Sequence, residues 1–149
     1  MSIKKMETQT NKEKLNKFVN HVFSTTADFG GMSGWIHTVQ SKDQCFFIEV
    51  EDCHFAEPIK QVTVNKVKLL GYGYDGEPYG GYCYKLTKEN YAWGICKWIA
   101  IKKYNDIVTD YQVMKMILEG VINLDHIDFD CGDAFDMTQY AMLGEVPFG

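Results

Sequence analysis

The chain has 149 residues, of which 46% are hydrophobic and 23% are charged. This length and composition are usual for one globular domain, so we expect a single domain over residues 1–149 and exclude a disordered chain. No segment approaches the roughly 18 consecutive apolar residues of a membrane span, and the N-terminal stretch has no apolar signal-peptide core. We therefore expect a cytoplasmic protein without a membrane partner.

Charge is unevenly distributed along the chain. All fifteen basic residues are lysine, so the bidentate recognition of phosphate and guanine by arginine is excluded. Residues 1–103 hold fourteen Lys and eleven Asp or Glu, giving +3, whereas residues 104–149 hold one Lys and nine Asp or Glu, giving −8. Such an acidic end repels nucleic acid and attracts basic surfaces. An acidic face that only contacts solvent explains the same uneven distribution of charge.

The N-terminal half contains signals for one helix and several strands. Thr10 and Glu13 have capping-box spacing, and apolar residues at helical intervals follow, so we predict a helix over 12–24. A glycine-rich bend over 29–34 follows, and Asp75-Gly76 is typical of a hairpin turn. Apolar alternation predicts strands over 35–39, 44–50, 61–70 and 79–86.

The C-terminal half is predominantly helical. Residues 91–103 fit a helical stripe, although a period of two fits nearly as well and Gly94 weakens the helix prediction. Thr109 and Gln112 begin a second helix that ends near Gly120, and a third covers 133–143. We expect an α+β fold: a small antiparallel sheet of three to five strands, with an N-terminal helix and two to three C-terminal helices packed on it.

Five aspartates lie around the start of the last predicted helix. The segment beginning at Asp128 differs from a calcium loop, because glycine falls at its fifth position and Gln139 at its twelfth. A structural explanation is that Asp130 or Asp133 caps the helix and the other carboxylates favour its N-terminus electrostatically. We expect no metal, and as a group the aspartates form a candidate partner-binding surface: Asp125, Asp128, Asp130, Asp133 and Asp136.

A second candidate surface is the segment 71–84, in which five tyrosines alternate with five glycines. Tyrosine offers a large contact area and glycine an adaptable backbone, as in antibody binding loops. A twisted hairpin with tyrosines covering one side of the sheet explains the same pattern. Stacking of these tyrosines on single-stranded nucleic acid is the third explanation, because it also needs a basic groove. The tyrosines predicted to bind a partner are Tyr72, Tyr74, Tyr79 and Tyr82.

Catalytic signals are weak. Five widely spaced cysteines without a C-x-x-C pair predict reduced thiols rather than disulfides or a zinc site. The adjacent Cys53 and His54 suggest a cysteine nucleophile with a histidine base. Neighbouring residues on a strand point to opposite faces, so His21 or His37 would have to supply the base instead. No phosphate-binding, dinucleotide-binding, hydrolase or metalloprotease motif is present. We therefore expect no cofactor.

The C-terminal stretch over 132–149, GDAFDMTQYAMLGEVPFG, resembles the ending of small uncharacterised proteins from bacterial phages and mobile elements. The resemblance covers about an eighth of the chain and implies no catalytic residue. Small acidic proteins of that origin often bind host nucleic-acid enzymes, as anti-restriction and anti-CRISPR proteins do. Our first hypothesis is a non-enzymatic module that binds a protein with a basic surface and no nucleic acid. The alternatives are a small enzyme with a Cys/His or carboxylate site and a small-ligand sensor built around the tyrosine hairpin.

Overall fold

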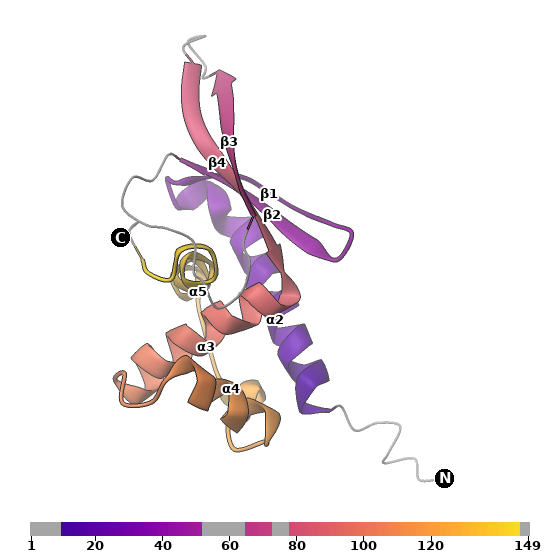
Figure 1. Cartoon of the computed structure of the whole chain (residues 1–149), viewed down its shortest axis with the longest axis vertical. Helices are drawn as coiled ribbons and strands as arrows, with labels where there is room; N and C mark the ends of the chain where they lie inside the picture. The colour runs from indigo at the N-terminus through magenta and orange to yellow at the C-terminus, as the bar shows by residue number, and fades with distance from the viewer. Residues whose placement is uncertain (1–9, 52–64, 73–77, 147–149) are drawn as a thin grey trace.

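The computed structural model describes residues 10–51, 65–72 and 78–146 (Figure 1). It confirms the predicted α+β fold, with four antiparallel strands, an N-terminal helix and three later α-helices. In Figure 1 the helices occupy the lower part of the view, and the last hairpin projects away from them at the top. The elements are α2 (Asn11–Phe29), η1 (Gly30–Met32), β1 (Ile36–Lys42), β2 (Cys45–Glu51), β3 (Asn65–Tyr72), β4 (Pro78–Thr87), α3 (Lys88–Tyr104), α4 (Asp110–Leu118), η2 (Leu124–His126) and α5 (Cys131–Leu143).

Two helix starts follow from their predicted caps. The Thr10 hydroxyl accepts a hydrogen bond from the backbone N–H of Glu13 at 3.1 Å, and Thr109 and Gln112 form a reciprocal capping box. Helix α2 continues to Phe29, five residues beyond its predicted end. Its buried face extends through a polar residue, Thr26, whose hydroxyl donates to the Val22 carbonyl at 3.0 Å. A count of apolar residues alone therefore ends this helix too early.

The four strands lie in the order β1-β2-β4-β3, and all three pairs are antiparallel. The turn between β1 and β2 consists of Asp43 and Gln44, which both have positive φ angles, of 53° and 61°. Two consecutive residues in the left-handed region are typical of a tight hairpin whose twist matches that of the strands. The predicted residues 61–64 of the third strand and the predicted Asp75-Gly76 turn lie outside the described residues.

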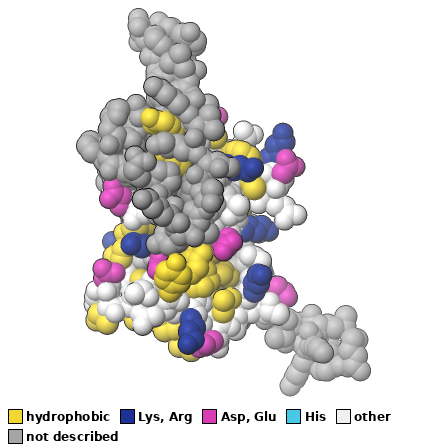
Figure 2. Space-filling model, viewed as in Figure 1, with side chains coloured by type: hydrophobic (Ala, Val, Ile, Leu, Met, Phe, Trp, Pro, Cys, Tyr) yellow, Lys and Arg dark blue, Asp and Glu magenta, His cyan; other side chains and the backbone are white. Residues whose placement is uncertain are grey.

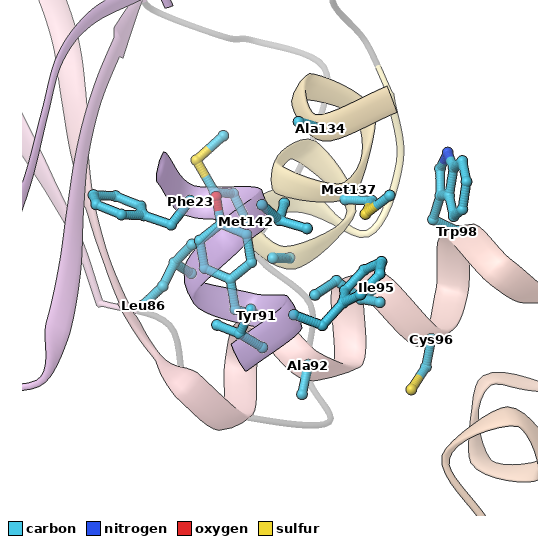
Figure 3. Packing of buried hydrophobic residues seen from close by; sticks show 14 of the residues in the cluster. Phe23, Leu86, Tyr91, Ala92, Ile95, Cys96, Trp98, Ala134, Met137 and Met142 are labelled. Carbon is cyan, nitrogen blue, oxygen red and sulfur yellow. The ribbon is translucent and has the colours of Figure 1, made fainter. Parts of the chain in front are cut away.

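The hydrophobic core lies against one face of the sheet. On β2, Phe46, Ile48 and Val50 are buried, whereas Phe47 and Glu49 between them are partly exposed. This is the alternation expected of a strand with one covered face. Aromatic and aliphatic side chains of α2, α3 and α5 meet that face (Figure 3). The Phe46 ring lies 4.5 Å from the ring of Phe23 on α2 and 5.3 Å from that of Tyr91 on α3.

Helices α3 and α5 cross at Gly94. A Cβ atom added to Gly94 would lie 2.6 Å from both the Cα and the Cβ of Ala141 on α5, far inside van der Waals contact. The absence of a side chain at Gly94 therefore allows the two backbones to approach each other closely. Residues 91–103 are helical, and the glycine that weakened this prediction lies where α3 contacts Ala141 of α5.

A buried polar group joins three helices at the centre of the core. The Tyr91 hydroxyl hydrogen-bonds to the Thr138 hydroxyl on α5, which lies 3.0 Å from the Thr26 hydroxyl on α2. All three residues are fully buried, so each hydroxyl needs such a partner. Burial raises the pKa of Tyr91 to about 12, although the bonds to Thr138 and Thr26 oppose the increase. Tyr91 is therefore a structural hydroxyl that stays protonated at neutral pH.

Among the described residues, no helix is both long and apolar enough to span a bilayer. On the face of the molecule in Figure 2, hydrophobic side chains gather below the grey atoms, where α3 lies, and lysine and acidic side chains are interspersed around them. The acidic residues thus do not form a uniform coat on this face.

Candidate protein-binding surfaces

The fold separates the five predicted aspartates into two groups. Asp130 is the N-cap of α5: its carboxylate accepts from the backbone N–H of Asp133 at 2.8 Å. Asp133 in turn accepts from the N–H of Asp130 at 3.1 Å, so two aspartates form a reciprocal capping box. This confirms the capping prediction. Asp136 follows one turn later on the same helix, whereas Asp125 and Asp128 precede α5 and face α2.

The first group belongs to a larger concentration of negative charge. Burial raises the pKa of Asp136; Lys102 on α3 lowers it, and Asp133 and Asp130 raise it further. Asp106, in the turn after α3, adds to this negative charge. Burial raises the pKa of Tyr140 on α5, and the nearby Asp136 and Asp106 raise it further. We define the acidic face as these four carboxylates: Asp106, Asp130, Asp133 and Asp136.

The second group of aspartates lines a groove that the sequence did not predict. Asp125 and Asp128 form one wall, and Lys14, Lys17 and His21 of α2 form the other. The groove has a volume of about 500 Å³, within the range of ligand-binding clefts. The Lys14 ammonium lies 3.4 Å from an Asp125 carboxylate oxygen, so part of the negative charge is neutralised within the protein. We call this cavity the α2 groove.

The floor of the α2 groove is aromatic. The ring centroids of Phe18 and Phe129 are 5.2 Å apart, and the ring of His21 lies 4.8 Å from that of Phe129. Phe18 is buried and also belongs to the hydrophobic core, whereas Lys17 beside it is exposed. The groove needs α2 and residues 124–129 to meet, although they are about a hundred residues apart in sequence.

The structure describes the predicted tyrosine surface only in part. Tyr82 is half-buried and packs against the core, and its neighbour Tyr84 is fully buried. The backbones of Tyr72 and Tyr79 lie in the paired strands β3 and β4, opposite Pro78 and Gly71. Tyr74 lies outside the described residues. Tyr82 therefore offers less contact area to a partner than a fully exposed tyrosine would.

Two of the four described thiols lack the features of catalytic nucleophiles. Cys45, Cys83, Cys96 and Cys131 are free. Burial, followed by the nearby Glu49, raises the pKa of Cys83, and burial followed by Asp110 raises that of Cys96, so both thiols stay protonated at neutral pH. Cys53 and His54 lie outside the described residues. Within the described ranges, no three His, Cys, Asp or Glu side chains form a group that would hold a metal ion.

A third exposed feature surrounds α4. The ring of Tyr111, in its first turn, lies 4.8 Å from the ring of Trp93 on α3 and remains 59% exposed. Leu118 at the end of the helix and Ile107 and Val121 in the flanking segments are also exposed. These exposed apolar side chains lie within residues 104–149, whose net charge is −8.

Comparison with protein-family models, with curated proteins and with solved structures finds no match for this chain.

Proposed function

We propose that this chain is a non-enzymatic protein-binding module whose acidic face contacts a basic surface on a partner. The observation that carries the proposal is a row of carboxylates along α5: Asp130 and Asp133 act on Asp136 near its start, and Asp136 and Asp106 act on Tyr140 further along, with Lys102 as the lysine that acts on Asp136. Like charges held together oppose one another, and a partner rich in lysine or arginine relieves this repulsion on binding.

A narrower form of the proposal names the class of partner as a nucleic-acid enzyme. Such enzymes hold the phosphate backbone in a basic groove, to which a cluster of carboxylates is complementary. The absence of arginine and the net charge of −8 over residues 104–149 argue against binding of nucleic acid by the chain itself. The resemblance of residues 132–149 to proteins of phages and mobile elements supports an inhibitor of the anti-restriction or anti-CRISPR type.

The proposal is tested by capture of proteins from a bacterial lysate on the immobilised chain. We expect a captured protein that is released as salt rises from about 0.1 to about 0.5 M, because salt screens exposed charges. A variant with Asp130→Asn, Asp133→Asn and Asp136→Asn should lose it, while asparagine preserves the cap of α5. A matched control neutralises three acids elsewhere: Asp28→Asn, Asp43→Asn and Glu89→Gln.

Capture that resists both salt and the triple substitution would contradict an electrostatic contact at the acidic face. An absence of any partner, together with an activity that is lost on Cys53→Ala, would favour the small-enzyme hypothesis instead. For the narrower form, the captured protein should lose its action on DNA when the wild-type chain is added, and the chain alone should leave the mobility of DNA unchanged.

A further inference from the structure

The α2 groove has the shape of a site for an extended chain. A smaller cavity of about 130 Å³ adjoins it and shares Lys14 and Leu124 as lining residues. Together the two cavities follow α2 from Asn11 to His21. Ten helical residues span about 15 Å, which is the length of four to five residues of extended peptide, at roughly 3.3 Å each.

Its walls carry charges of opposite sign that remain available. Lys14 and Asp125 pair with each other across the groove. Further along, Lys17 and His21 on one wall and Asp128 on the other are exposed, and within the described part of the chain they form no ion pair. A ligand that satisfies both walls therefore needs a negative and a positive group, set on either side of its backbone.

The floor between these walls selects an apolar group. The Phe18 and Phe129 rings lie 5.2 Å apart, and the ring of His21 lies 4.8 Å from that of Phe129. An aromatic or aliphatic side chain placed there contacts the partly exposed ring of Phe129 and removes its apolar surface from water, whereas Phe18 is already buried. A phosphate or nucleic acid strand satisfies Lys17 and His21 but meets the carboxylates of Asp125 and Asp128.

From this geometry we propose that the α2 groove binds an extended peptide segment of a partner protein, in which an apolar side chain lies between an acidic and a basic one. The acidic side chain pairs with Lys17 and accepts a hydrogen bond from the His21 ring, the basic one pairs with Asp128, and the apolar one covers Phe129. The site is distinct from the acidic face and does not depend on the function proposed for that face.

The test is a nuclear magnetic resonance titration of the full-length ¹⁵N-labelled chain with two tripeptides, Ac-Glu-Phe-Lys-NH₂ and Ac-Lys-Phe-Glu-NH₂. Either order of charges suits the proposal, because the walls do not fix the direction of the peptide. We expect shifts at the amides of His21, Asp128 and Phe129 with at least one of them. The uncharged Ac-Gln-Phe-Gln-NH₂ should bind about tenfold more weakly or not at all, since it lacks both charge-assisted contacts.

A matched pair of variants on one helix locates the contact. Lys17 lines the groove and Lys12 does not, and both are exposed, so neither Lys17→Glu nor Lys12→Glu should unfold the chain. We expect Lys17→Glu to weaken binding of the charged tripeptide about tenfold and Lys12→Glu to change it less than about twofold. The triple asparagine variant of the acidic face should bind the tripeptide as the wild type does, which separates this site from the proposed function.

Three results would overturn the proposal. The first is an absence of localised shifts at millimolar concentrations of both charged tripeptides. The second is equal binding of the uncharged tripeptide, or an equal effect of Lys17→Glu and Lys12→Glu. The third is an equally strong shift of the same amides with inorganic phosphate alone, which would make the groove a site for anions rather than for a peptide.

Discussion

Gln44 adopts a left-handed backbone conformation that is costly for a residue with a side chain. Together with Asp43 it forms the two-residue turn between β1 and β2, where Asn-Gly or Asp-Gly is the usual pair. We predict that Gln44→Gly increases the free energy of unfolding by about 1 kcal/mol, because glycine relieves this strain. Urea denaturation measures the change. The control is Gln40→Gly on β1, which should destabilise the chain; a loss of stability with both substitutions would contradict the argument.

Tyr91 provides a residue-scale prediction of pH dependence. Its pKa is raised from 10 to about 12, so between these pH values the phenol ionises in the unfolded chain but stays protonated in the folded one. This contribution to stability is complete below pH 10 and is lost as pH rises towards 12. Tyr91→Phe should cost roughly 1 kcal/mol at pH 8 through the lost hydrogen bond. That difference should shrink by roughly 1.4 kcal/mol per pH unit above pH 10.

Urea denaturation of the wild type and Tyr91→Phe, at intervals from pH 8 to pH 11.5, measures this trend. Other tyrosines and the lysines titrate in both chains and cancel in the difference. A difference in stability that stays constant over this range would show that the Tyr91 hydroxyl ionises as readily in the folded chain as in the unfolded one.

At the scale of elements, the helix starts are predictable because their causes are local. The caps at Thr10, Thr109 and Asp130 act on a residue three positions away, so the sequence contains both partners. It was harder to predict that residues 91–103 form a helix, because Gly94 weakens a helix in isolation. The structural reason for this glycine is its contact with Ala141, which lies 47 residues later in the sequence. The α2 groove has no local signal at all, since its two walls come together only in the folded chain.

The contact between α3 and α5 leads to a prediction for Gly94→Ala. Alanine favours an isolated helix by about 1 kcal/mol, but its methyl group would meet the backbone of Ala141. We expect a net loss of roughly 1–3 kcal/mol, because the helices must move apart. Thermal unfolding followed by circular dichroism measures the loss. Gly31→Ala is the control, since a Cβ there meets nothing within 4 Å; equal effects of the two substitutions would contradict close packing at Gly94.

At the scale of the whole molecule, negative charge concentrated at the start of α5 should limit stability. Burial and the neighbouring Asp133 and Asp130 raise the pKa of Asp136, so ionisation of Asp136 opposes folding. The stability of the wild type should therefore fall as pH rises through this pKa. We predict that Asp136→Asn stabilises the chain at pH 7 by up to about 0.5 kcal/mol, since solvent and Lys102 reduce the effect.

The gain from Asp136→Asn should disappear below the unperturbed pKa of 3.8, where the carboxyl group is protonated in both the folded and the unfolded states. Denaturation by urea at pH 3, pH 5 and pH 7 measures this dependence. Asp28→Asn on α2 is the control, and it should change stability less. A gain that persists at pH 3 would mean that the asparagine acts by packing rather than by removing charge.

The contact between Trp93 and Tyr111 gives the protein a built-in optical reporter. The indole belongs to α3 and the phenol to α4, and their rings lie 4.8 Å apart in a partly solvated setting. Detachment of α4 would expose this indole to water, whereas Trp35 and Trp98 are buried elsewhere in the core. With Trp35 and Trp98 replaced by phenylalanine, the emission of Trp93 should therefore follow the local opening of one short helix, without any attached dye.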